Sequence, residues 1–485
     1  MHARWLSSAF LLIAASSAGV AAPATSEGAK AIEQGYADFF SKAVIDKGIV
    51  SVAPDGEDYV VAWDLQKALD LAGPPKGALR IERFSYTLTP VGEGSWTVKA
   101  DRFPNLAFDA PTDKGNVAGT FNLSGFHLET AYDAAQVNFL RSLVAVDLLA
   151  GKFHIADVAR GADIDLAESG ISVETRAKTS DSGAGVDVAL AQSVKSLTET
   201  VLAPPPNGQG APVKVTYNVD GVVGGAAITG LRAREIGDFW KYVVAHVEDA
   251  DAPPEWKQRL RATLPVWNNL QANAEIHDLT LQMPMVDATL KTLGETIGLS
   301  GFVADGAAEI GVKIDELAFK SPLLPSWAEQ LSPASLSLDL RVTGTGLDQA
   351  AELALDDPNF GGKADLSPET QDKIGQILLA GRPKIALSPG RLTTPLLDLA
   401  FEGEASVDTG APSARFTFSA DGLDKTIALL EDIAKTEPDL QTAALGVTFL
   451  KGLATAGPDG RLVWKVEVTE AGEVSVNGTP LPTGK

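Results

Sequence analysis

The segment 399–435 constrains the fold of this chain most strongly. Apolar and polar residues alternate from Leu399 to Val407, and they alternate again in the sequence ARFTFSA, which includes Phe416 and Phe418. The sequence DTGAP separates the two runs. Alternation on both sides of a turn predicts a β-hairpin with one apolar and one polar face.

A helix is expected directly after this hairpin, and the same arrangement occurs upstream. Apolar residues at helical spacing follow Gly422, with Asp424 as the expected N-cap. The alternating segment 336–342 leads in the same way through Gly346, Leu347 and Asp348 into an apolar run. The two glycines are 76 residues apart, so the chain carries two units of strand, Gly-Leu-Asp turn and helix.

Composition limits the classes of partner. The 485 residues are 45% hydrophobic and 21% charged, which is enough for two or more domain-sized cores. The net charge of −23 would repel a phosphate backbone, so nucleic acid is not expected as a partner. The same charge disfavours electrostatic adhesion to an anionic membrane, although local apolar contact with lipid remains open.

Residues 1–22 have the pattern of a secretory signal peptide. Arg4 precedes a short apolar stretch, and small residues follow it up to Ala22. We therefore expect cleavage near Ala21 to Ala24 and a periplasmic location; a short N-terminal anchor helix is the alternative. The chain has no cysteine, which excludes a lipobox, disulfides and thiolate metal sites. After the signal no uninterrupted apolar stretch reaches ~18 residues, so no transmembrane span is expected in the mature chain.

The first part of the mature chain is predicted to consist of one helix and a series of hairpins. The helix face contains Ile32, Tyr36, Phe39, Phe40, Ala43 and Val44. The expected strands are 49–52, 59–63, 79–89, 95–100, 117–130, 153–155, 164–166, 171–173 and 186–188. The apolar segment 137–149 has no decisive period and is compatible with a buried helix or a buried strand; the helix is favoured.

The sequence APPPNGQGAP at 203–212 is the best candidate for a domain boundary. Proline and glycine dominate it, and nothing in it would enter a core. It divides the mature chain into an N-terminal β-rich domain (23–203), a linker or loop (204–212) and a C-terminal β-rich domain (213–485) with the two Gly-Leu-Asp units. The alternative is a surface loop within one continuous sheet.

The second part is predicted to repeat the pattern of long strands with occasional helices. Strands are expected at 213–219, 274–282, 307–319 and 336–342, and helices at 236–247, 253–264 and 324–331. A hairpin of 462–468 with 474–476 ends the sheet, followed by a turn at Asn477 and Gly478. The predicted fold class is α+β, with long, curved, mostly antiparallel β-sheets built of meander hairpins and helices packed on the concave face.

Catalytic signals are weak. Asp408-Thr409-Gly410 and Asp181-Ser182-Gly183 resemble the paired loops that give aspartic proteases their dyad, but Asp and Gly are also common turn residues. Motifs for serine hydrolases, P-loops and dinucleotide binding are missing.

The remaining candidates are equally weak. His127, His154, His246 and His277 are far apart and show no metal-ligand spacing. The tryptophans Trp240, Trp256 and Trp267 are interpreted as core residues, with a ligand box as the alternative. We assign no catalytic, cofactor-binding or metal-binding residue.

The C-terminal sequence GRLVWKVEVTEAGEVSVNGTPL (460–481), preceded by the two Gly-Leu-Asp units, resembles an uncharacterised family of proteobacterial envelope proteins with signal peptides. That family is distantly similar to the YdgA and AsmA group. The resemblance covers most of the mature chain and implies long curved sheets with an apolar groove connected with lipid handling. It transfers no functional residue. This chain has only a cleavable signal, in contrast to membrane-anchored AsmA proteins.

Three hypotheses follow. The first is a non-enzymatic periplasmic protein that binds a lipid or another apolar envelope ligand in a sheet concavity. The second is a structural or interaction protein of the envelope with a filled core and no ligand. The third is an envelope hydrolase that uses Asp408 and Asp181, and it ranks far behind. An open or a filled sheet face distinguishes the first two.

Overall fold

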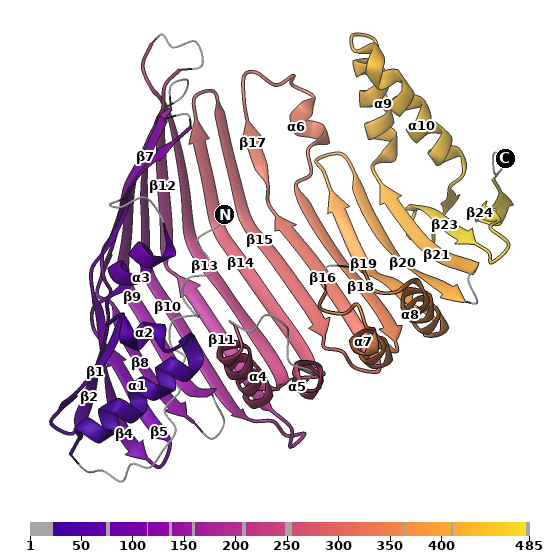
Figure 1. The fold of residues 1–485 in the computed structure, drawn as a ribbon. Helices are drawn as coiled ribbons and strands as arrows, with labels where there is room; N and C mark the ends of the chain where they lie inside the picture. Colours follow the sequence, from indigo (N-terminus) through magenta and orange to yellow (C-terminus); the bar gives the residue numbers. More distant parts are fainter. Residues whose placement is uncertain are drawn as a thin grey trace. The chain divides into compact units, whose positions relative to one another are not determined.

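A computed structural model describes residues 23–73, 78–113, 115–134, 138–157, 161–205, 210–247, 255–362, 364–408 and 411–481. The chain divides into two compact units, residues 1–267 and residues 268–485, and each is described by itself. Both consist mainly of antiparallel strands that follow one another as hairpins, with fewer helices (Figure 1). The predicted class is therefore confirmed. The signal-like residues 1–22 lie outside the described residues.

The first unit contains thirteen strands in its described residues. They are β1 (Val50–Asp55), β2 (Asp58–Trp63), β3 (Leu79–Ile81), β4 (Phe84–Gly92), β5 (Ser95–Ala100), β6 (Leu106–Thr112), β7 (Gly115–Ser124), β8 (His127–Asp133), β9 (Asn138–Asp157), β10 (Ala162–Thr179), β11 (Val186–Val194), β12 (Ser196–Ala203) and β13 (Val213–Leu231). Its helices are α1 (Ser26–Phe40), α2 (Ala43–Asp46), α3 (Leu65–Ala72), α4 (Ala233–Ala245) and α5 (Trp256–Ala262). The strands turn through a curve, and α1, α2 and α3 lie on its inner side (Figure 1).

The segment 137–149, for which a helix was favoured, belongs to strand β9. It pairs with β7 and β8 along one edge and with β10 along the other. A strand in the middle of a sheet can carry apolar residues on both faces, so its sequence loses the simple alternation. Pairing with distant segments, which local periodicity does not report, decided the conformation of this segment.

Single glycines divide the long strands of the first unit. Gly125, with φ of 62°, separates β7 from β8, where the sequence predicted one strand. Gly170, with φ of 58°, interrupts the ladder of β10, and a Cβ at this position would lie 2.8 Å from the Cβ of Lys195. Both sites need the left-handed conformation that glycine adopts without strain.

The segment 204–212 joins two paired strands. Ala203 at the end of β12 is paired with Val213 at the start of β13, and residues 206–209 lie outside the described residues. The segment therefore connects a hairpin within the first unit, as the alternative interpretation had it. The division between the two units falls instead between Trp267 and Asn268.

The first helix fills the core of the first unit. The side chain of Thr25 accepts a hydrogen bond from the Gly28 nitrogen at 3.0 Å and caps α1. Ile32 and Tyr36 then pack against Val61, Leu88 and other buried residues of β1, β2, β4, β5 and β8. The hydroxyl of Tyr36 shares a hydrogen bond with that of Tyr86, and burial raises the pKa of Tyr86 to about 12.

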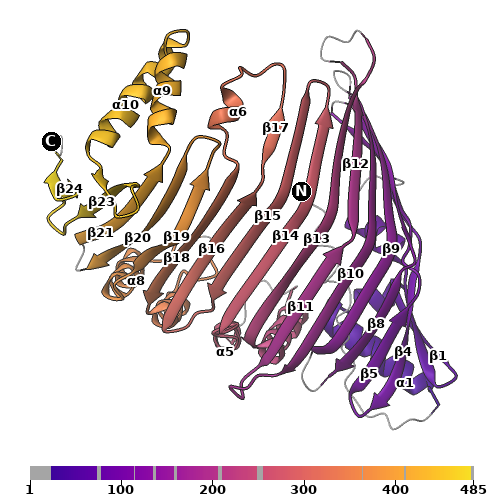
Figure 2. The same ribbon diagram turned by 180° about the vertical axis from the view of Figure 1, so that it is seen from behind.

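The second unit contains twelve strands in its described residues. They are β14 (Asn269–Met283), β15 (Val286–Ser300), β16 (Asp305–Asp315), β17 (Ala318–Lys320), β18 (Ser335–Thr345), β19 (Lys384–Thr393), β20 (Asp398–Asp408), β21 (Ala411–Asp421), β22 (Thr455–Ala456), β23 (Leu462–Val468), β24 (Val474–Val476) and β25 (Thr479–Pro480). Its helices are α6 (Ala328–Leu331), α7 (Leu347–Asp356), α8 (Pro368–Ala380), α9 (Leu423–Ile433) and α10 (Gln441–Gly452), with a short 3₁₀ helix, η1 (Pro438–Leu440). The helices lie at the two ends of the long strands (Figures 1 and 2).

Both Gly-Leu-Asp units form a strand followed directly by a helix, but their cap differs from the prediction. The N-cap positions of α7 and α9 are Gly346 and Gly422, with φ of 83° and 81°. Asp424 lies inside the first turn of α9 and forms an ion pair with Lys451. A left-handed glycine lets the strand turn straight into the helix, which leaves no extended position for a side-chain cap.

A buried carboxylate connects α7 with α8. Asp357 follows α7 and accepts hydrogen bonds from the Ser367 hydroxyl at 2.6 Å and from the Asn359 nitrogen at 2.8 Å. Hydrogen bonds, of which the one from the Ser367 side chain has the largest effect, hold the pKa of Asp357 well below its usual range. Ser367 is also the N-cap of α8, so one network fixes the end of one helix and the start of the next.

Candidate functional site

The strands of the second unit align their apolar residues in rows on one face of the sheet. Residues paired across antiparallel strands point to the same face. One row pairs Ile297 with Ile310, and then continues through Leu340 and Leu387. The next row contains Leu299, Ala308, Val342 and Ile385. This face is therefore apolar from β15 to β19.

A large part of this face is in contact with solvent. Ile297, Leu299, Ile310, Val342 and Ile385 are each between 39% and 50% exposed, although they occupy the apolar positions of long strands. We call these five residues the apolar strip. They are neighbours in adjacent rows, so their exposed surfaces adjoin one another. Contiguous exposed aliphatic surface is unusual and typically marks a site of interaction.

The opposite face of the same strands is polar. Arg341 precedes Val342 and is paired with Glu309, while Thr296 precedes Ile297 and is paired with Gly311. Contact with water is therefore favourable on the polar face and unfavourable on the apolar face.

One carboxylate belongs to the apolar face. Glu295 lies two positions before Ile297 on β15, opposite Val312 and Ala274, and is exposed. Its charge places a local negative potential at the border of the apolar strip. A ligand with a negative group beside its apolar part would be repelled there.

The C-terminal end of the same face is covered. Ala420, Trp464 and Val476 of the sheet pack against Leu423 and Ile427 of α9, forming a small buried core. The indole nitrogen of Trp464 donates a hydrogen bond to the Leu450 carbonyl at 2.7 Å, which connects α10 to β23. The helix pair therefore covers the sheet near β21 and β23 and not at the apolar strip.

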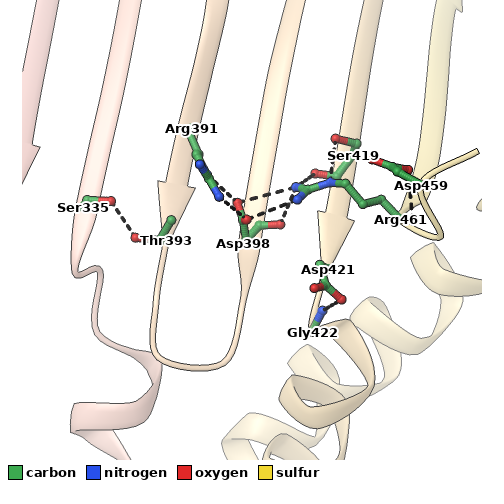
Figure 3. A network of polar contacts seen from close by, with 9 residues as sticks. All are labelled: Ser335, Arg391, Thr393, Asp398, Ser419, Asp421, Gly422, Asp459 and Arg461. Atoms are coloured by element: carbon green, nitrogen blue, oxygen red, sulfur yellow. Dashed lines mark hydrogen bonds and ion pairs between the residues drawn. The ribbon is translucent and has the colours of Figure 1, made fainter. Parts of the chain in front are cut away.

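A polar clamp connects the strands next to this helix pair (Figure 3). Asp398, at the start of β20, accepts hydrogen bonds from Arg391 at 2.7 Å and from Arg461 at 3.1 Å. Arg461 also donates to the carbonyl of Ser419 on β21 at 3.1 Å. The bonds from Arg391, followed by those from Arg461, lower the pKa of Asp398 to about 2. Both guanidinium groups are bound to the same carboxylate. The clamp therefore connects strands of the sheet, and its two arginines are not available to bind an anionic ligand.

The two Asp-x-Gly loops lie in different units. Asp181 is an exposed residue of a turn in the first unit, where Lys178 donates to its carboxylate at 3.0 Å. Asp408 ends β20 in the second unit, and Thr409 and Gly410 lie outside the described residues.

The histidines have separate local partners. The Nδ1 atoms of His127 and His154 lie 2.8 Å and 2.6 Å from carboxylates of Asp101 and Asp163. His277 lies 3.6 Å from Glu275, and Nδ1 of His246 is 2.8 Å from the Tyr242 carbonyl. Among the described residues, His, Asp and Glu form no group of three that could hold a metal ion.

Of the three tryptophans, Trp240 departs from the expected core position. It is exposed, and its indole nitrogen donates to the Phe39 carbonyl at 3.0 Å, which connects α4 to α1. Trp256 begins α5 with Lys257 near its ring, and Trp267 is half-buried.

Comparison with known proteins found no matching family model, no similar curated protein and no similar solved structure. In the described part of the chain, every helix is too short or too polar to cross a membrane.

Sequence reasoning predicted two strands of the apolar face, β16 and β18, but missed β15 and β19, which carry Ile297, Leu299 and Ile385, and it did not find the apolar strip as a site. The alternation in 336–342 already identifies Leu340 and Val342 as members of one face. It does not show whether a helix covers them, because coverage depends on where α7 to α10 pack.

Proposed function

We propose that this chain is a non-enzymatic protein of the cell envelope that binds a lipid or another apolar envelope molecule on the apolar strip of its second unit. The signal-like sequence of residues 1–22 supports a periplasmic location. The observation that carries the proposal is the exposure of the five aliphatic residues of the strip, side by side on adjacent strands.

The chemistry of the strip favours acyl chains over a protein partner. All five side chains are aliphatic, and their paired neighbours are Leu340, Leu387 and Ala308. Protein interfaces draw most of their binding energy from Trp, Tyr and Arg, and none of these belongs to the strip. An acyl chain offers only apolar groups, and each buried CH₂ contributes about 0.8 kcal/mol.

The first unit shows the alternative arrangement. There α1 covers the strands β1, β2, β4, β5 and β8, where residues such as Leu88 and Val61 are fully buried. A structural or interaction protein without a ligand would be expected to have both sheets closed in this way. The exposed strip of the second unit is what favours ligand binding.

Mass spectrometry of the protein, purified gently from the cell envelope, tests the proposal under native and then denaturing conditions. We expect a lipid at fixed stoichiometry in the wild type and its loss in the double variant Ile310→Ser, Val342→Ser. Arg341→Ala is the matched control, because Arg341 is the neighbour of Val342 on the polar face. A clean apo mass for the wild type, with no lipid recovered by extraction, would support the ligand-free interaction protein instead.

A further inference from the structure

One end of the second unit collects exposed apolar side chains from three separate segments. The strands β14, β16, β19 and β21 all end there, because neighbouring strands are antiparallel. Figures 1 and 2 show the end of β14, α6 and the pair α9 and α10 at this same end. Its exposed large apolar residues, between 42% and 67% exposed, are Met285, Leu323, Leu324, Leu445, Phe449 and Leu450. We call these six residues the tip residues.

The first two segments are adjacent loops. Met283 is paired with Val286, so Pro284 and Met285 form the tight turn between β14 and β15. The pairing of Asp287 with Lys320 then places the loop that starts at Ser321 next to this turn. The Leu323 nitrogen donates to the Ser321 hydroxyl at 3.2 Å, which orders the start of that loop.

The third segment is α10. Leu445 and Phe449 are four residues apart and share one side of the helix. Ala444 is buried, the Trp464 indole holds the Leu450 carbonyl, and Lys451 is paired with Asp424 of α9. The helix is therefore fixed to the unit while Leu445 and Phe449 face outward.

We propose that this end of the second unit docks on the surface of a lipid bilayer, with the tip residues inserted at the level of the headgroups. The tip residues come from separated protrusions, whereas a stable protein interface needs a continuous patch of about 800 Å² on each partner. A bilayer presents one plane to all protrusions that reach the same level.

The charge of the tips indicates which bilayer they fit. The segments 283–286, 321–327 and 441–450 contain no charged residue, the connection between α9 and α10 carries Lys435, Glu437 and Asp439, and the whole chain has a net charge of −23. Attraction to anionic lipid cannot drive the contact, so apolar insertion must. Zwitterionic vesicles should therefore bind at least as well as anionic ones.

This docking rests on the proposed function in one respect, because it would give the apolar strip access to membrane lipid. Leu293 of β15, paired with Ile276, lies between the two regions, and Glu295 separates it from Ile297. The tip residues and the strip residues are different side chains, so experiments can separate the two proposals.

The absence of cysteine makes a direct test possible. Single cysteines replace Leu323 or Phe449 in the full chain and carry an environment-sensitive fluorophore, and phosphatidylcholine vesicles are added with and without a lipid-bound quencher. We expect blue-shifted, quenched emission from both sites. The matched controls are Phe302→Cys, at the opposite end of the same unit, and Val247→Cys in the first unit, which are 49% and 70% exposed in the wild type. Both should stay unchanged.

A second measurement tests affinity without a label. The triple variant Leu323→Ser, Leu324→Ser, Phe449→Ser should lower vesicle co-sedimentation at least roughly tenfold, because the insertion of apolar side chains drives binding. The strip variant Ile310→Ser, Val342→Ser should sediment like the wild type. Unchanged emission from Leu323→Cys and Phe449→Cys, a response from the control sites, or binding only to anionic vesicles would overturn the docking proposal. If the protein still binds vesicles but no lipid co-purifies with it, the proposal for the apolar strip fails and the docking proposal stands.

Discussion

The carboxylate of Asp398 and the guanidinium of Arg461 lie 3.1 Å apart and connect β20 with the start of β23, although β21 lies between these two strands. The bond therefore crosses a strand, and Arg461 contacts that strand too, through the Ser419 carbonyl. The α9 and α10 pair rises from the same end of the sheet, so the clamp supports the segment that carries three of the tip residues.

The two arginines of the clamp should differ in their effect on stability. The side chain of Arg461 is 21% exposed and that of Arg391 is 60% exposed. We expect Arg461→Ala to lower the free energy of unfolding by about 1–3 kcal/mol, and Arg391→Ala by less than about 1 kcal/mol. Urea unfolding measures both, with the exposed Arg415→Ala on β21 as the control. Equal losses from Arg391 and Arg461 would contradict this account of the clamp.

The clamp also predicts a dependence on acid. Because hydrogen bonds lower the pKa of Asp398 to about 2, from an ordinary value of 3.8, the folded state binds its proton less readily than the unfolded state. The stabilisation is complete above about pH 4 and is lost as the pH falls toward about 2. Unfolding measured from pH 5 to pH 2 should show a shallower loss of stability in Asp398→Asn than in the wild type. Parallel curves would show that this carboxylate does not contribute.

Substitution of a buried and of an exposed aliphatic residue should distinguish a role in packing from a role in ligand binding. Leu88 is fully buried in the first unit, and Leu88→Ala should cost about 2–5 kcal/mol of unfolding free energy. Ile310 belongs to the exposed strip, so Ile310→Ala should cost less than about 1.5 kcal/mol and should reduce the lipid that co-purifies. Chemical denaturation and lipid extraction of both variants check this. A large loss of stability in Ile310→Ala would mean that the strip is part of a packed core.

Glu295 should influence which ligand the strip accepts. Because it places a negative charge on the apolar face, Glu295→Gln should raise the affinity for a fatty acid roughly threefold and leave that for an uncharged monoacylglycerol unchanged. Titration with fluorescent analogues of both ligands measures the ratio. Glu309→Gln, on the polar face of the neighbouring strand, is the control, and the same change there would argue against a local effect of Glu295.

The glycine before α9 should tolerate no side chain. Gly422 and Gly460 have nearly equal φ values of 81° and 83°, but a Cβ at Gly422 would overlap the Leu396 carbonyl oxygen, whereas at Gly460 it would meet open space. We expect Gly460→Ala to cost about 1–2 kcal/mol from backbone strain and Gly422→Ala to cost more. Thermal unfolding of both variants measures the difference. Equal costs would show that backbone strain alone decides.

The sequence predicted most strands but only part of what surrounds them. Alternation identified 399–407 and 462–468, which form β20 and β23, because a half-buried strand records its two faces locally. For the segment 137–149 the sequence left helix and strand open and the helix was favoured, but it forms part of β9, which has paired strands on both edges and therefore lacks a simple alternation. The cap of α9 was assigned to Asp424, while the left-handed Gly422 takes that position.

By itself, the sequence determined the antiparallel, hairpin-built character of this protein, since period-two alternation and glycine turns are properties of neighbouring residues. It also determined which side chains share a face. Only the tertiary structure decided which faces are closed. Helix α1 closes the face of β1, β2, β4, β5 and β8 in the first unit, whereas the helices of the second unit pack at the ends of its strands and leave Ile297, Ile310 and Val342 exposed. Burial depends on contacts between segments far apart in the chain, and no local pattern contains them.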